Sequence, residues 1–339
     1  MPEQADGLEE SWRQNEAIAT SFQTSSPAVG DEHVFVGGLG ETFYALARED
    51  GRVVWTHNRD GSMSDSSPTV QDGTVYVGSG GGSLYAFDAV DGSIEWRQGG
   101  SSAITSSPIV RDGVVYVGRN DGVLWALDAD DGSIRFEYEV GSPINTDIAY
   151  SSAREAIYVS TADLGVSAHD VTDGGRMLWA QRFGSDVGSS TPVVDDRKGV
   201  LYFASNEVRA LDTGDGAIVW GTSFYGTNAG SSPIFDDDSV YVGSASGKVY
   251  RIPHPETTLA TASDWTFQTW DISIAADPVI VGDALVVGTL SGTLFLLEIE
   301  SGSQLDQCSL SCDLRAKPAV DGTDIYISGD GGGVYAFEL

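Results

Sequence analysis

Apolar and polar residues alternate along this chain in short runs, and the runs recur at a fixed distance. Residues 66–96 read SSPTVQDGTVYVGSGGGSLYAFDAVDGSIEW, and residues 106–136 read SSPIVRDGVVYVGRNDGVLWALDADDGSIRF. Within the first stretch, TVYVG and SLYAFD have the period-two pattern of strands, and Gly-Gly or Asp-Gly stands between the runs. These dipeptides supply the positive φ that tight hairpins need. The pattern therefore predicts four short antiparallel strands in each unit.

A landmark proline marks the repeat along the whole chain, and Ile148 takes its place in one unit. The prolines are Pro27, Pro68, Pro108, Pro192, Pro233, Pro278 and Pro318. Neighbouring landmarks are 40 to 45 residues apart, which gives eight units. Four-stranded meanders repeated at this distance are typical of a β-propeller, with one meander per blade. We therefore predict a single all-β domain over residues 1–339, an eight-bladed β-propeller of four-stranded antiparallel blades.

The two ends of the chain are predicted to meet in one blade. The last unit stops at Leu339 after three strands, while DGLEESW at residues 6–12 has the shape of DGGRMLW at residues 173–179. We expect residues 7–13 to form the outer strand of the C-terminal blade. Closing the ring in this way removes the exposed face that an open array of blades would leave.

Charge narrows the classes of partner. The chain has 50 Asp and Glu against 18 Lys and Arg, a net charge of −32, and the acidic residues are spread over the turns. Halophiles use such net charge to keep proteins soluble, so we predict a salt-loving source. Nucleic acid is excluded as a partner, because its recognition needs a basic patch.

The sequence carries few signals for the location of the protein or for the state of its cysteines. No segment reaches the roughly 18 apolar residues of a membrane span, and the first residues lack the basic and apolar parts of a signal peptide. We therefore expect a cytoplasmic monomer. The alternative is an envelope or extracellular protein whose leader has been removed. Cys308 and Cys312 are interpreted as thiols or a short disulfide of structural meaning, because no further metal ligands cluster near them.

An aromatic residue ends most repeats at a fixed offset from a turn glycine. Residues 86–96, AFDAVDGSIEW, recur as ALAREDGRVVW at 45–55 and as ALDTGDGAIVW at 210–220. A large ring at this position can cover neighbouring backbone and small side chains, so we interpret these aromatics as structural. They are Trp12, Trp55, Trp96, Phe136, Trp179, Trp220 and Trp265.

This segment resembles the tryptophan-docking motif of PQQ-like repeats, found in quinoprotein alcohol dehydrogenases and in BamB-like propeller lipoproteins of bacterial outer-membrane assembly. The likeness covers essentially the whole chain. It departs at residues 251–265, where the turn is longer, and at residues 296–307, which have no aromatic. The resemblance implies a non-catalytic binding scaffold with a protein partner and no required cofactor. The alternatives are a PQQ-binding oxidoreductase that uses PQQ and Ca²⁺, and the sensor domain of an envelope protein.

Candidate binding residues lie where the repeat is broken. The residue before the landmark is a small hydroxyl in five units and is Asp147, Asp277 or Lys317 in the other three. These positions precede the innermost strands, so we expect them to surround the mouth of the central channel. The predicted ligand site adds residues from nearby loops and turns, namely Arg315, Trp270, Asn145 and Arg119. Lys317 and Arg315 would face an anion, and Trp270 would stack on it.

The alternative interpretation of this ring is a solvated funnel whose charges pair with one another. Loops and turns equivalent to those of the predicted site also carry Asn120, Tyr225 and Asn228. No arrangement of a nucleophile and a base is present, and we predict neither catalytic residues nor a metal site. The acidic run from Asp128 to Gly132 is interpreted as a hairpin turn and not as a calcium loop.

Overall fold

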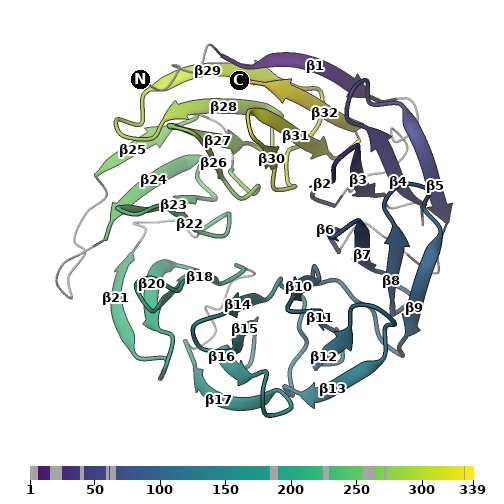
Figure 1. Cartoon of the computed structure of the whole chain (residues 1–339). Helices are drawn as coiled ribbons and strands as arrows, with labels where there is room; N and C mark the ends of the chain where they lie inside the picture. Colours follow the sequence, from purple (N-terminus) through teal and green to yellow (C-terminus); the bar gives the residue numbers. More distant parts are fainter. Residues whose placement is uncertain are drawn as a thin grey trace.

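The protein forms a ring of eight sheets. The computed structural model describes residues 7–15, 25–38, 42–58, 61, 66–183, 190–223, 229–254, 264–270, 273–331 and 333–339. Eight four-stranded antiparallel sheets are arranged around a common axis, as Figure 1 shows. The predicted eight-bladed propeller is therefore confirmed. No helix in the described part of the chain is long and apolar enough to cross a bilayer.

The strands of each blade follow one another from the axis outward. Blade 1 contains β2 (Ala28–Val29), β3 (His33–Gly37), β4 (Thr42–Ala47) and β5 (Val53–Asn58). Blade 2 contains β6 (Thr69–Gln71), β7 (Thr74–Gly78), β8 (Ser83–Asp88) and β9 (Ile94–Gly99). Blade 3 contains β10 (Ile109–Arg111), β11 (Val114–Gly118), β12 (Val123–Asp128) and β13 (Ile134–Glu139). Blade 4 contains β14 (Ala149–Ser151), β15 (Ala156–Thr161), β16 (Gly165–Asp170) and β17 (Arg176–Gln181).

The other four blades repeat this order, and the last one borrows its outer strand from the N-terminus. Blade 5 contains β18 (Val193–Asp195), β19 (Val200–Ala204), β20 (Glu207–Asp212) and β21 (Ile218–Ser223). Blade 6 contains β22 (Ile234–Phe235), β23 (Ser239–Gly243), β24 (Lys248–Pro253) and β25 (Trp265–Gln268). Blade 7 contains β26 (Val279–Val281), β27 (Ala284–Gly288), β28 (Thr293–Glu298) and β29 (Gln304–Ser309). Blade 8 contains β30 (Ala319–Asp321), β31 (Asp324–Gly329), β32 (Gly333–Glu338) and β1 (Glu9–Gln14).

The meander gives the ring two different faces. Turns between the second and third strands, and the loops that lead to the next blade, lie on what we name the upper face. Turns between the first and second and between the third and fourth strands lie on the lower face. The second strands are buried along their whole length in β3, β11 and β27, because neighbouring blades cover both sides of each sheet.

The aromatic side chain of an outer strand lies on the turn glycine of the next blade. A Cβ on Gly132 of blade 3 would be 2.5 Å from Cε3 of Trp96 in β9. The Trp96 indole nitrogen donates a hydrogen bond of 2.8 Å to the Ala129 carbonyl in the same turn. Five further pairs have the same close approach: Trp12–Gly51, Trp55–Gly92, Phe136–Gly175, Trp179–Gly216 and Trp265–Gly302. The turn at residues 255–263, which follows Trp220 in this order, lies outside the described residues.

The ends of the chain close the ring as predicted. Strand β1 pairs antiparallel with β32, and both termini lie at this blade in Figure 1. The strand begins at Glu9, two residues later than predicted. Arg48 of blade 1 reaches across the junction to blade 8, where it forms ion pairs of 2.7 Å with Asp321 and 3.1 Å with Asp324.

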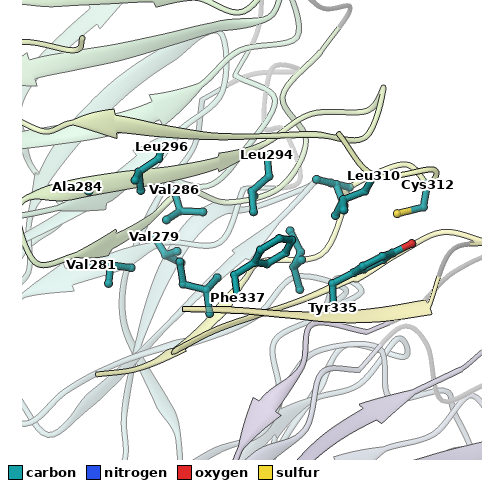
Figure 2. Packing of buried hydrophobic residues seen from close by; sticks show 13 residues of the cluster. Val279, Val281, Ala284, Val286, Leu294, Leu296, Leu310, Cys312, Tyr335 and Phe337 are labelled. Atoms are coloured by element: carbon teal, nitrogen blue, oxygen red, sulfur yellow. The ribbon is translucent and has the colours of Figure 1, made fainter. Parts of the chain in front are cut away.

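Apolar residues fill the space between blades 7 and 8. Figure 2 shows Leu294 and Leu296 of β28 on one side of this cluster and Tyr335 and Phe337 of β32 on the other. Cys312 belongs to the cluster, and burial raises the pKa of its thiol. Both cysteines are free thiols in the structure. Of the two predicted states, the structure therefore contains the reduced one.

The aromatic docking predicts a difference between two glycines of blade 3. Gly132 and Gly113 have φ of +70° and +72°, but a Cβ on Gly113 would meet only Arg135 Nη2, at 3.9 Å. Gly113→Ala should cost about 1–2 kcal/mol in left-handed backbone strain. Gly132→Ala must also displace Trp96 and should cost about 3 kcal/mol more, within the range of core truncations. Urea unfolding followed by tryptophan fluorescence measures both, and equal losses would contradict the docking.

Candidate functional site

A chain of hydrogen bonds joins the blades around the axis on the upper face. In each blade we name the residue before the landmark position the ring residue. The backbone N–H of one ring residue donates to the side-chain oxygen of the next. Six such links are formed: Ser26 to Ser67, Ser67 to Ser107, Ser107 to Asp147, Thr191 to Ser232, Ser232 to Asp277 and Lys317 to Ser26. Their lengths run from 2.6 to 3.1 Å.

The residue before the ring residue ties the loop to its own blade. Ser106 is fully buried, and its hydroxyl accepts from the Gly118 N–H at 2.8 Å, at the upper end of β11. Ser66 makes the same contact with the Gly78 N–H in blade 2, at 3.0 Å. The repeated Ser-Ser pair thus has two roles. The first serine holds the loop, and the second receives the neighbouring blade.

Asp147 and Asp277 occupy positions where other blades have a hydroxyl. Asp147 Oδ1 accepts from the Ser107 N–H at 2.7 Å, and Asp277 Oδ1 accepts from the Ser232 N–H at 2.6 Å. Hydrogen bonds to a charged acceptor are shorter and stronger than those between neutral groups. Both carboxylates therefore have a clear structural role in joining blades.

Burial dominates the electrostatics of Asp277. It raises the pKa of the carboxyl, while the positive charge of Lys317 lowers the pKa and the negative charge of Asp147 raises it further. The three ring charges thus influence one another, as expected for residues gathered at one channel mouth. Lys317 itself is exposed, and it lines a cavity of about 370 Å³ together with Ser26, Pro27 and Pro318.

The other predicted site residues are dispersed over the upper face. Asn145 and Arg315 occupy equivalent loop positions, two residues before Asp147 and Lys317, and both are exposed. Arg315 forms ion pairs with Asp330 at 3.0 Å and Asp313 at 3.6 Å. Its charge is therefore partly neutralised by the protein. Tyr225 and Asn228 lie outside the described residues.

Arg119 is engaged by the protein and does not face the channel mouth as an open cation. It is only 6% exposed, and its guanidinium lies 4.4 Å from the ring centre of Trp125. One Nη donates to Asp121 at 2.5 Å and to Ser101 at 3.0 Å. Burial among these groups gives Arg119 a packing role in blade 3.

Trp270 differs from every other tryptophan in the described residues. Its side chain is 90% exposed, and its backbone has φ of +59°. The equivalent residue in blade 3, five positions after the docking aromatic, is Gly141 with φ of +90°. Non-glycine residues in this region carry strain, which persists only where the surroundings impose it.

Two contacts were missed by the sequence reasoning. One is the hydrogen-bond ring, whose signal was the small hydroxyl repeated before each landmark. The other is Asp306, which occupies the aromatic position of blade 7. Its Oδ2 accepts from the Leu8 N–H at 2.8 Å, in the segment that enters β1. A carboxylate thus replaces the docked ring at the junction where the termini meet.

The alternative function would need residues that bind PQQ and Ca²⁺. PQQ with Ca²⁺ requires several oxygen ligands around the cation. Within the described ranges, no group of three His, Cys, Asp or Glu side chains could hold a metal ion. In the acidic run of blade 3, Asp128 instead accepts from the Asp130 N–H at 2.9 Å and pairs with Arg135 at 2.8 Å. Among the described residues no such carboxylate cluster is available to the cation, and no catalytic step is assigned to this cofactor pair.

Comparison with known proteins identifies relatives by sequence. A family profile described as outer membrane protein assembly factor BamB matches residues 4–149, 59–177 and 162–339. Proteins of that name from Pseudomonas aeruginosa and Salmonella typhimurium are each 28% identical to this chain, over 179 and 175 residues. The matches cover 49% and 48% of this chain, and 44% and 42% of the relatives. The matched segment therefore spans less than half of each curated relative.

Solved structures with the same fold have different roles. BamB from Moraxella catarrhalis has a TM-score of 0.79 at 19% identity, covering 98% of this chain and 100% of that one. The computationally designed Ika8 protein reaches 0.80 at 15% identity, with the same coverage. A quinohemoprotein alcohol dehydrogenase from Comamonas testosteroni reaches 0.79 at 15%, covering 98% of this chain and 76% of its own. At these identities the likeness shows the fold alone, and a fold does not determine a function.

The raised pKa of Asp277 predicts how a neutral substitution will behave. The folded protein binds this proton more readily than the unfolded chain, so the carboxyl costs stability as the pH rises above its ordinary pKa of 3.8. Asp277→Asn keeps an oxygen for the Ser232 N–H and removes the charge. We expect it to raise the urea midpoint at pH 7 and to lose that advantage below about pH 4.

The matched control for this prediction is Asp277→Ala, which removes the acceptor as well as the charge. It should be less stable than Asp277→Asn at both pH values, since a buried N–H would lose its partner. An advantage of Asp277→Asn that did not change between pH 7 and pH 4 would contradict the assignment.

Proposed function

The chain belongs to the BamB family of PQQ-repeat β-propellers, and from this premise we propose that it is a non-catalytic scaffold which binds another protein through its upper face. The curated relatives are outer membrane protein assembly factors by name. A scaffold role agrees with that name, but the observation that carries the proposal is the exposure of Trp270.

An exposed tryptophan is the strongest single indication of a protein contact on this surface. The described docking tryptophans are covered or partly covered by the neighbouring blade, whereas 90% of Trp270 is in water. Tryptophan is enriched among the residues that contribute most to protein–protein affinity, because it buries a large area when it fills a pocket. We assign Trp270 the role of an anchor of this kind.

Hydrogen bonds hold Gln268 and Thr269, the two residues that lead to Trp270, in place before any partner binds. The Thr269 N–H donates to the Gly247 carbonyl at 3.0 Å, and the Thr269 hydroxyl donates to the same oxygen at 2.8 Å. The Gln268 amide adds a hydrogen bond to the Gly247 carbonyl at 3.1 Å. These contacts hold the backbone directly before Trp270 against the turn of blade 6. A preorganised anchor loses less entropy on binding.

Charge indicates the chemistry of the partner. The net charge of −32 leaves few free cations, and on the upper face Arg119, Arg209 and Arg315 are each paired with an acidic side chain. Complementary charge favours association and suppresses wrong partners. We therefore propose a basic protein that offers an apolar pocket to the indole.

The other expectations from the sequence concern the cofactor, the location, the oligomeric state and the source of the protein. The proposal requires no cofactor and no catalytic residue. The cytoplasmic location, the monomeric state and the salt-loving source stay predictions from the sequence. The PQQ-dependent oxidoreductase stays the alternative function.

The proposal predicts that one substitution will weaken binding and strengthen the fold. Trp270→Gly removes the anchor and places glycine where blade 3 has Gly141. Relief of backbone strain should raise the free energy of unfolding by about 1 kcal/mol. Affinity for the partner should fall at least about tenfold, as is typical of a central anchor. Urea unfolding and surface plasmon resonance measure the two effects.

The partner itself can be captured by photo-crosslinking in cells of the source organism. A benzoylphenylalanine placed at position 270 should crosslink one basic protein, and the same probe at Val90 should not. Val90 is 65% exposed on the lower face, so it controls for exposure alone. Unchanged affinity in Trp270→Gly would overturn the anchor. Dye-linked alcohol oxidation upon addition of PQQ and Ca²⁺ would favour the oxidoreductase instead.

A further inference from the structure

The hydrogen-bond ring has a break at Lys317 that the repeat does not explain. Each of the six links ends on a side-chain oxygen, as in Ser232 to Asp277. An ammonium group has three donors and no acceptor. Lys317 can therefore donate its backbone N–H to Ser26, at 2.9 Å, but it cannot receive the link from Asp277. A second break follows Asp147, next to residues 184–189, which lie outside the described residues.

Two donors of the ring consequently have no acceptor in the described protein. Among the described residues, the Asp277 N–H has no hydrogen bond, and the Lys317 ammonium has neither a hydrogen bond nor an ion pair. The Lys317 ammonium is thus a cation available to an anionic ligand, at the one ring position whose side chain cannot act as the acceptor of a link between blades.

The lining of the cavity beside Lys317 indicates the kind of molecule that would carry the anionic group. Of the described residues that line it, Ser26 and Lys317 are polar, and the others are aliphatic or proline, among them Ile234, Ile280 and Val320. They come from blades 1, 6, 7 and 8 and include inner-strand residues along the channel. The cavity is therefore polar at its ring end and aliphatic elsewhere. Asp147 and Asp277 do not line it.

The volume indicates how much of a ligand the cavity can cover. About 370 Å³ corresponds to roughly a dozen heavy atoms, if each occupies the ~30 Å³ of a liquid water. A single carboxylate at one end and an unbranched or lightly branched hydrocarbon at the other would match this lining.

We infer that the inner channel between blades 6 and 1 is a binding site for a medium-chain aliphatic carboxylate, whose head group pairs with the Lys317 ammonium beside Ser26. The hydrocarbon tail packs against Ile234, Ile280 and Val320. This site is independent of the Trp270 surface, and it requires no cofactor and no reaction.

Isothermal titration calorimetry with sodium octanoate tests the site on the full chain at low salt, where ionic contacts are least screened. We expect saturable one-to-one binding to the wild type. Octan-1-ol, which has the same tail without the charge, should bind at least about tenfold more weakly, since a charge-assisted hydrogen bond is lost.

Variants at position 317 separate the ammonium group from the fold. Lys317→Met keeps the length of the side chain and should weaken octanoate binding by at least about tenfold. Lys317→Ser supplies the missing ring acceptor, so it should raise the urea midpoint while abolishing octanoate binding. We therefore expect Lys317→Ser to be folded and unable to bind octanoate, even if Lys317→Met is unstable.

The outcomes distinguish this inference from the scaffold proposal. Trp270→Gly should bind octanoate as the wild type does. No saturable binding to the wild type, or equal binding by Lys317→Ser, would overturn the channel site and leave the protein-binding surface untouched. Loss of octanoate binding in Trp270→Gly would show that the ligand lies on the loop surface instead of in the channel.

Discussion

The contact on which this molecule depends is the docking of one blade's aromatic ring on the next blade's turn glycine. No blade can bury both of its faces alone, so each needs a neighbour set at a fixed distance and angle. Trp96 against Gly132 shows how that distance is fixed, because the ring rests where a Cβ would have to be. Glycine is required at this position for two reasons: the turn has a positive φ, and the ring leaves no room for a Cβ. The same contact at six of the described junctions gives them the same geometry, and a constant rotation per blade closes a ring.

The junctions next to the chain ends depart from this rule in ways that follow from closure. Blade 8 is assembled from both termini, so the turn that would receive a ring from blade 7 belongs to the segment entering β1. Asp306 takes the aromatic position and binds the Leu8 N–H instead. On the other side of blade 8, Trp12 docks on Gly51 in the usual way, and Arg48 adds ion pairs to Asp321 and Asp324. A backbone hydrogen bond at one junction and ion pairs at the other thus support the one blade that is not continuous in sequence.

Periodicity made the fold predictable, whereas contacts between units were much less so. The blade count, the strand order and the closing strand all follow from local patterns that recur, because alternation and turn glycines act within a few residues. The partner of each aromatic could not be read in the same way. Trp96 and its glycine are 36 residues apart in the sequence and belong to different copies of the repeat. The hydrogen-bond ring was likewise visible only as a preference for serine. Arg119 was grouped with the channel mouth from its position in a turn, but its contact with Trp125 depends on a side-chain direction that the turn does not determine.

A repeat protein makes its functional residues recognisable, because the structural demand at each position is known from the other copies. Serine at the ring position satisfies the link between blades at little cost, so a lysine there gives up a hydrogen bond that its seven equivalents have the side chain to accept. In blade 3 a glycine at the position of Trp270 adopts the left-handed conformation freely, whereas the tryptophan carries strain there and leaves an apolar surface in water. Lys317 and Trp270 therefore each lower the stability of the folded ring. Residues that a fold would be more stable without are those for which a role outside the fold is the better explanation. Asp147 and Asp277 differ from these two residues, because each carboxylate accepts the link that a serine accepts in other blades, although the charge of Asp277 costs stability at neutral pH.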